Sequence, residues 1–189
     1  MDNNQKIDKR NVFLKGKNIL LCALSISDIE NSNWYGWFND EEVCENLQKH
    51  YYPNTLSLQK DYLINKLEKD KTTLQLGIYD LKNEKLVGVT SFYSIDFINR
   101  KAGFSIVIGE KEARNISYFI EVAKLMFAHG FFTLNLERIY GGSISIDLVN
   151  LMCRALGCEK EGELRKDIYK NGVYHTAHLY GILRDEFKK

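Results

Sequence analysis

Hydrophobic and polar positions along the chain follow two spacings, a period of two and a period near 3.6, in alternating segments. Strand-like segments are 18–23, 74–80, 86–96, 101–109, 136–145, 163–170 and 173–183. Helix-like segments run from 27 with an interruption near Gly36, from 56 to 69, from about 115 to 130 and from 147 to 157. The predicted order is one strand, two helices, three antiparallel strands, a helix, a strand, a helix and a hairpin.

Short signals mark where these elements begin and end. Asn171-Gly172 between two β-biased segments predicts a hairpin with a type I′ turn. Gly157 suits the end of the last helix, because glycine takes the left-handed conformation there at little cost. Helix N-caps are expected at Ser27, which has capping-box spacing to Glu30, at Asn39 ahead of Glu42, at Asn115 or Ser117, and at Asp147.

Length, charge and apolar content bound the class of protein. With 189 residues, 44% of them hydrophobic, we expect a polar tail at 1–11 and one domain at 12–189. The net charge of +1 gives no positive field that would indicate nucleic acid. No apolar run approaches the ~18 residues that span a bilayer, and no signal peptide is evident, so we expect a cytoplasmic protein away from membranes. The four cysteines lack C-x-x-C spacing, which favours core thiols, and no metal is expected.

Residues 105–132 combine an apolar strand, a polar turn and a long apolar helix. A strand that feeds directly into a helix leaves the first helical N–H groups without partners and aimed at one spot. The positive end of the helix favours an anion at that spot. The pattern fits either an anion-binding cradle or an ordinary strand-to-helix connection.

The strand SIVIGEKE and the following loop RNISYF resemble the GNAT superfamily of N-acetyltransferases in its RimJ/RimL-like branch. The resemblance covers about residues 12–187. It implies an α+β single domain with a central, twisted, mixed but mostly antiparallel sheet, flanking helices and a C-terminal β-hairpin. It also implies that acetyl-CoA is the acyl donor. In the family pattern Q/R-x-x-G-x-G/A, Arg114 matches, whereas Ser117 and Phe119 stand at the two glycine positions.

The two missing glycines bear on cofactor binding. Glycine lets the backbone approach a phosphate closely or take a positive φ without steric cost. A phenylalanine on the first turn that points into the core would still leave the amides available. The resemblance implies cofactor-binding positions on the strand and the loop, and the polar face of the last helix offers two further candidates, Asn150 and Arg154. The strand and loop positions are Ile106, Val107, Ile108, Gly109, Arg114, Asn115, Ile116, Ser117 and Tyr118.

Candidate catalytic groups are few. The resemblance places a proton-donating tyrosine on the last helix, where this chain has Cys153 in the segment CRALGC. A thiol can donate a proton, although a small side chain that fills space is the plainer interpretation. The family's frequent acidic residue is Gly103 here, so the general base is sought elsewhere. Side chains alternate along strand 86–96, so Ser94 and Asp96 lie on one face and Ser91 and Tyr93 on the other. Ser94 is the candidate catalytic residue on this strand.

The segment WYGWFNDEEV resembles the helical region that borders the acceptor pocket in the family. Aromatic faces beside amide and carboxylate tips suit a sugar or a peptide, although aromatic residues here could equally be core. His175, after the hairpin turn, resembles a family position near the same cleft. The substrate-binding candidates are Trp37, Asn39, Asp40, Tyr93 and His175.

The leading hypothesis is an acetyl-CoA-dependent N-acetyltransferase that acts on a small-molecule or peptide amine. Its preferred acceptor is the amino group of a nucleotide-linked amino sugar. One alternative acceptor is a protein N-terminus, as in ribosomal-protein acetyltransferases. A hypothesis from another class is a catalytically degenerate GNAT-fold binding module, which the missing glycines and tyrosine suggest. A homodimer is left open.

Overall fold

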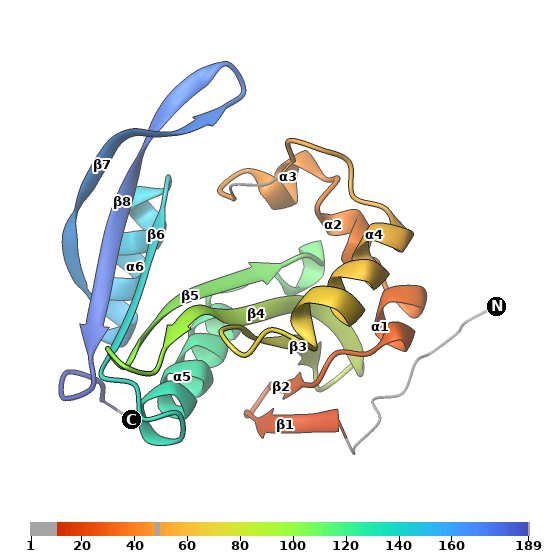
Figure 1. The fold of residues 1–189 in the computed structure, drawn as a ribbon, viewed down its shortest axis with the longest axis horizontal. Helices are drawn as coiled ribbons and strands as arrows, with labels where there is room; N and C mark the ends of the chain where they lie inside the picture. The colour runs from red at the N-terminus through yellow and green to blue at the C-terminus, as the bar shows by residue number, and fades with distance from the viewer. Residues whose placement is uncertain (1–10, 48–49, 189) are drawn as a thin grey trace.

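The computed structural model describes residues 11–47 and 50–188 of the chain (Figure 1). Its centre is an eight-stranded sheet in the order β1-β2-β3-β4-β5-β6-β8-β7, in which only β5 and β6 are parallel. The strands are β1 Val12–Lys15, β2 Ile19–Cys22, β3 Leu74–Asp80, β4 Lys85–Asp96, β5 Lys101–Ile108, β6 Arg138–Ser143, β7 Glu159–Lys170 and β8 Val173–Leu183. The expected mixed, mostly antiparallel sheet with a C-terminal hairpin is confirmed.

Helices cover both faces of the sheet, and each face has its own apolar core. The long helix α5 Ile116–Phe132 and helix α6 Ile146–Leu156 pack on one face around Phe92, Phe127 and Met152. The shorter helices lie on the other face, where Ile29, Trp34 and Leu63 meet β2–β4 (Figure 1). They are α1 Ile26–Asn31, α2 Trp34–Trp37, α3 Glu41–Cys44, α4 Leu56–Asp61 and the π-helix η2 Tyr62–Leu67; a 3₁₀ turn, η3 Lys111–Ala113, precedes α5.

The pairing of β5 changes along its length, and this change positions the site. The parallel pairing with β6 runs from Lys101–Arg138 to Gly103–Tyr140. Beyond Gly103, β5 stays paired with β4 as far as Ile108, while β6 continues beside β8. The edge of β5 from Phe104 onward therefore faces an opening between two strands of the same sheet.

The carboxylate of Glu121 ties the start of helix α5 to the turn between β1 and β2. Glu121 accepts hydrogen bonds from the backbone N–H of Lys17, from that of Asn18 at 2.8 Å, and from the Asn18 side-chain amide at 2.8 Å. These donors form the turn between β1 and β2. Because Glu121 lies in the second turn of α5, its bonds hold the start of that helix in place.

Three expected N-caps are wrong by one or two residues. Helix α1 is capped by Ser25 with Asp28, rather than by Ser27 with Glu30. Asp40 rather than Asn39 caps α3, and Ser145 rather than Asp147 caps α6. Each of these segments offers several polar residues within one turn, and the cap is the one whose extended backbone lets its side chain reach the first helical amides.

Other boundaries also differ from the sequence prediction. The strand β1 was not expected, and the single helix predicted at 56–69 changes to π geometry from Tyr62 to Leu67. Strand β7 begins at Glu159, four residues before the predicted start. Helix α5 continues to Phe132 because Gly130 packs against Phe92 and Ile139 inside the helix instead of ending it. Apart from Asn11, the expected N-terminal tail lies outside the described residues.

Replacing Glu121 with alanine should lower the free energy of unfolding by about 2 kcal/mol, because several donors lose a charged acceptor. Glu121→Gln should lose less, since its amide oxygen still accepts. Urea denaturation followed by circular dichroism measures both. Lys124→Ala on the exposed side of α5 is the matched control and should change stability by less than about 0.5 kcal/mol; equal losses for Glu121→Ala and Lys124→Ala would contradict the anchoring role.

Candidate functional site

The opening between β5 and β6 is a groove of about 690 Å³, called here the β5–β6 groove. Strand β5 forms one wall with Phe104 to Ile108, and α6 forms another with Leu148, Leu151 and Met152. The start of α5 closes one end with Arg114, Asn115, Ile116 and Phe119. The groove thus runs from a helix N-terminus along the free edge of a strand.

The start of α5 offers unpaired backbone donors. Asn115 caps the helix, and its side-chain oxygen accepts the N–H of Tyr118 at 2.8 Å. The N–H groups of Ile116 and Ser117, the first two of the helix, have no intrahelical acceptor. Together with the positive end of the helix, they make this end of the groove attractive to an anion.

Arg114 lies at the same end of the groove, where its positive charge is paired with the carboxylate of Glu42. Its guanidinium donates to Glu42 at 2.6 Å and to the carbonyl of Gly109 at 3.0 Å. Its Nε–H is buried without a hydrogen-bond partner in the described part of the chain. The side chain is therefore held in place by its bonds to Glu42 and Gly109.

The two residues at the family's glycine positions fit without backbone strain. Neither Ser117 nor Phe119 has a positive φ, so a glycine is not required for the backbone path. Phe119 packs against the main core and also lines the groove. The first-turn amides remain at the end of the groove, beside an apolar wall.

A second cavity, the aromatic pocket, lies on the opposite face of the sheet and measures about 570 Å³. Its lining combines aromatic rings and uncharged polar groups, and none of the described residues that line it is Asp or Glu. The lining residues are Trp34, Phe38, His50, Tyr51, Tyr52, Pro53, Asn54, Gln59, Tyr62, Gln75, Val89, Ser91, Tyr93, Ser105 and Val107.

The groove and the aromatic pocket share Tyr93, Ser105 and Val107. The Tyr93 ring packs against Gly103, where an added Cβ would come within 2.3 Å of the ring. Ser105 and Ser91 are hydrogen-bonded across β4 and β5 at 2.8 Å. Burial, with a smaller contribution from Tyr140, raises the pKa of Tyr93, so this phenol is neutral near pH 7. The two cavities therefore meet where β5 leaves β6.

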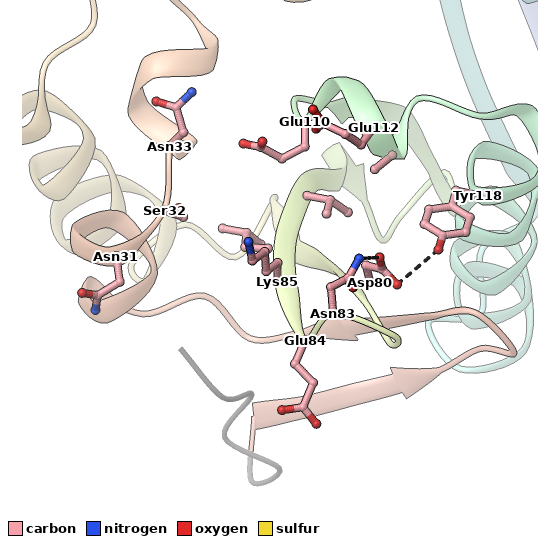
Figure 2. A pocket seen from close by; sticks show the side chains of 13 residues that line it. Asn31, Ser32, Asn33, Asp80, Asn83, Glu84, Lys85, Glu110, Glu112 and Tyr118 are labelled. Carbon is pink, nitrogen blue, oxygen red and sulfur yellow. Dashed lines mark hydrogen bonds between the residues drawn. The ribbon is translucent and has the colours of Figure 1, made fainter. Parts of the chain in front are cut away.

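A third, polar pocket of about 400 Å³ lies on the other side of the α5 start, between β3–β4 and α1 (Figure 2). Its lining includes four acidic residues, Asp80, Glu84, Glu110 and Glu112, together with Lys85. Tyr118 turns toward this pocket and donates to Asp80 at 3.2 Å (Figure 2). The carboxylates would repel a phosphate, so this pocket does not suit a nucleotide-like anion.

The structure divides the expected cofactor-binding residues into two sets. Those that line the β5–β6 groove are Ile106, Val107, Ile108, Arg114, Asn115 and Ile116. Those outside its lining are Gly109, Ser117, Tyr118, Asn150 and Arg154. Gly109 lies beneath Trp37, whose ring would be 2.0 Å from a Cβ at that position, and Arg154 is exposed on α6.

Among the expected substrate-binding residues, Tyr93 lines both cavities, whereas Trp37, Asn39 and Asp40 line neither. Trp37 is buried and donates to Glu110 at 2.8 Å. Asn39 accepts the N–H of Asn54 at 2.6 Å and so fixes the loop that carries the pocket's tyrosines. Asp40 caps α3. His175 on β8 lines neither cavity.

The two catalytic candidates also lie outside both linings. Ser94 sits at a register break in β4 with φ of 50°, which interrupts the alternation that placed it on one face with Asp96. Cys153 is half-buried on α6 and packs against the main core. The sequence reading missed Phe119 and Tyr180 as groove residues. Tyr180 could be found only by knowing which residue of β6 it faces.

The sequence of the chain was compared with known families and proteins. The family described as acetyltransferase (GNAT) domain matches residues 18–147. The chain belongs to this family. It is a GNAT N-acetyltransferase, and enzymes of this family use acetyl-CoA.

Similar proteins match between about half and nearly all of the chain. The SPbeta prophage-derived uncharacterized N-acetyltransferase YokL of Bacillus subtilis is 24% identical over 93% of this chain and 96% of its own. Spermidine N(1)-acetyltransferase of Escherichia coli K12 is 32% identical over 53% of this chain and 54% of its own. The crystal structure of spermidine N-acetyltransferase from Vibrio cholerae, in complex with CoA and spermine, superposes with a TM-score of 0.79 at 22% identity, covering 89% of this chain and 97% of that one. In the described part of this chain, no helix is long and apolar enough to cross a membrane.

Proposed function

We propose that this acetyltransferase binds acetyl-CoA in the β5–β6 groove and acetylates the primary amine of a small, ring-bearing acceptor held in the aromatic pocket. The preferred acceptor is a nucleotide-linked amino sugar. The observation that carries the proposal is the junction of the two cavities at Tyr93, Ser105 and Val107. A donor on one face of the sheet and an acceptor on the other could meet there.

The groove residues fit the parts of acetyl-CoA. The free N–H group of Ile116, which lines the groove beside Arg114, would bind the pyrophosphate, and the N–H group of Ser117 is the next donor along α5. The unpaired edge of β5 from Ile106 to Ile108 would hydrogen-bond the amides of the pantetheine arm, as an added strand does. When bound, acetyl-CoA supplies the acetyl group as a reactive thioester.

The pocket's chemistry favours an acceptor without several positive charges. A polyamine is stabilised by carboxylates, and no described residue that lines the aromatic pocket carries one. Tyr52 and Tyr62 offer faces for a ring, while Gln59 and Gln75 offer amides for hydroxyl groups. The spermidine acetyltransferases that this chain resembles are therefore a guide to its fold and donor rather than to its acceptor.

The residues that line the groove and the aromatic pocket also determine how the acceptor amine can lose its proton. None of the described residues in either lining is a carboxylate, so the amine would pass its proton to water. The neutral amine is the nucleophile, and an amine of low basicity is partly neutral near pH 7. Sugar amines are less basic than lysine, which fits a site without a dedicated base. A protein N-terminus shares this property and is the second candidate, in line with the likeness to the putative ribosomal N-acetyltransferase YdaF of Bacillus subtilis.

Steady-state assays with three acceptor classes test the acceptor proposal. A nucleotide-linked amino sugar should give at least a tenfold higher kcat/KM than spermidine or a peptide with a free N-terminus, a difference of about 1.4 kcal/mol. Tyr52→Ala should raise the KM for the sugar with little change in the KM for acetyl-CoA, because Tyr52 lines only the aromatic pocket. Tyr174→Ala, an exposed tyrosine on the hairpin, is the matched control. Spermidine as the best acceptor would contradict the proposal.

The cofactor assignment is tested by removing a single N–H. Ile116→Pro deletes one free amide at the first helical position, where proline is tolerated and where the extended Asn115 can precede it. The Kd for acetyl-CoA should rise roughly tenfold, as expected for losing a hydrogen bond to a charged group. Isothermal titration calorimetry measures it.

The control is Ile146→Pro, which makes the same change at the first position of α6, outside the groove lining. Its thermal stability should match that of Ile116→Pro, and its affinity for acetyl-CoA should match the unmodified protein. If both variants bind acetyl-CoA equally well, the start of α5 does not hold the pyrophosphate.

A further inference from the structure

We propose that the hydroxyl of Tyr180 on β8 donates the hydrogen bond that stabilises the sulfur of acetyl-CoA as it departs. This inference rests on the proposed binding of acetyl-CoA in the β5–β6 groove. It gives the role that the family resemblance assigned to Cys153 to a residue on a different element.

The position of Tyr180 follows from strand pairing. Tyr180 of β8 lies opposite Gly141 of β6, and its ring covers that glycine closely: a Cβ at Gly141 would lie 2.4 Å from the Tyr180 oxygen. Gly141 immediately follows Tyr140, the last residue of β6 that pairs with β5. The hydroxyl therefore lies at the apex of the groove, where the two strands separate.

The hydroxyl of Tyr180 lacks a partner within the described chain. The residue as a whole is only 5% exposed, but its hydroxyl is not among the fully buried polar atoms that lack a partner, so the oxygen is accessible from the groove that Tyr180 lines. The hydroxyls of buried Tyr79 and of half-buried Tyr62 and Tyr118 bond to side chains of other elements. No such bond occurs for Tyr180 among residues 11–47 and 50–188, and the residue lines the groove. A ligand in the groove could accept a hydrogen bond from this hydroxyl.

Tyr180 and Tyr93 flank the junction from opposite sides. Tyr180 belongs to the core packed under α5 and α6, whereas Tyr93 also lines the aromatic pocket on the other face. An amine would approach past Tyr93, and the leaving sulfur would remain on the side of Tyr180. Cys153 lies close enough to Tyr180 to interact with it electrostatically, but only Tyr180 lines the groove.

The chemistry requires a donor that keeps its proton. The bond from nitrogen to the acetyl carbon forms as the carbon–sulfur bond breaks, the electron pair of that bond goes to sulfur, and the proton lost by nitrogen finally balances the thiolate. Burial, with smaller contributions from neighbouring Cys158 and Tyr93, raises the pKa of Tyr180. Tyr180 therefore stays protonated and stabilises the thiolate as a hydrogen-bond donor, without acting as a base.

Tyr180→Phe is the direct test, because phenylalanine keeps the ring over Gly141 and removes only the hydroxyl. With the best acceptor of the panel, kcat should fall about 10- to 100-fold while the KM for acetyl-CoA stays within about twofold, as for a donor that acts on developing charge. Tyr174→Phe makes the same change at an exposed position and should retain the kcat of the unmodified protein.

A readout without turnover uses CoA alone. The ultraviolet absorbance of the thiolate gives the pKa of the thiol of bound CoA, and removing its donor should raise that pKa by about one unit, a tenfold change in the ionisation constant. Tyr180→Phe should show this increase and Tyr174→Phe should not. A structural defect alone would weaken CoA binding without moving the titration of the bound thiol.

The outcomes separate this inference from the proposed function. If the unmodified protein neither binds acetyl-CoA nor transfers acetyl groups, the proposed function fails. If it does both, and Tyr180→Phe retains its kcat and its thiol titration, only the role of Tyr180 is overturned. The same holds if Cys153→Ala, rather than Tyr180→Phe, lowers kcat and raises the pKa of the bound thiol.

Discussion

Strands β5 and β6 share three parallel pairs, from Lys101–Arg138 to Gly103–Tyr140, and then diverge. Each strand keeps its hydrogen bonds on the far side, β5 with β4 and β6 with β8, so the sheet stays intact around the opening. A continuous sheet would separate its two faces completely. The divergence connects the groove under α5 and α6 with the aromatic pocket on the opposite face.

The start of α5 carries the proposed anion site without the family's glycines. What a phosphate needs is unpaired N–H groups at a helix end, and the cap formed by Asn115 provides that geometry with ordinary backbone angles. Phe119 then adds an apolar wall instead of removing the site. Having Ser117 and Phe119 in place of the two glycines changes the wall of the groove and leaves the first N–H groups of α5 without intrahelical acceptors.

Much of the fold could be predicted from the sequence because it depends on local signals. The Asn171-Gly172 turn, with φ of 50° and 80° at its two residues, and the Asn115 cap are examples, since each is specified within four residues. The caps formed by Ser25 and Ser145 were missed because neighbouring polar residues offered equivalent local choices. The register break at Ser94 was missed because it depends on how β4 pairs with β5.

The site was harder to predict because it depends on contacts between distant segments. Trp37 looked like a pocket residue, yet it is buried against Gly109, more than seventy residues away. Tyr180 gave no local signal, and its place at the groove follows from its pairing with Gly141. Alternation along a strand shows which residues share a face, but not which face borders a cavity.

A crystal structure with bound CoA tests the central claim most directly. The account predicts pyrophosphate oxygens within hydrogen-bonding distance of the Ile116 and Ser117 N–H groups, and the sulfur beside the Tyr180 hydroxyl at the point where β5 leaves β6. A CoA bound outside the β5–β6 groove, or with its sulfur away from the junction with the aromatic pocket, would contradict it.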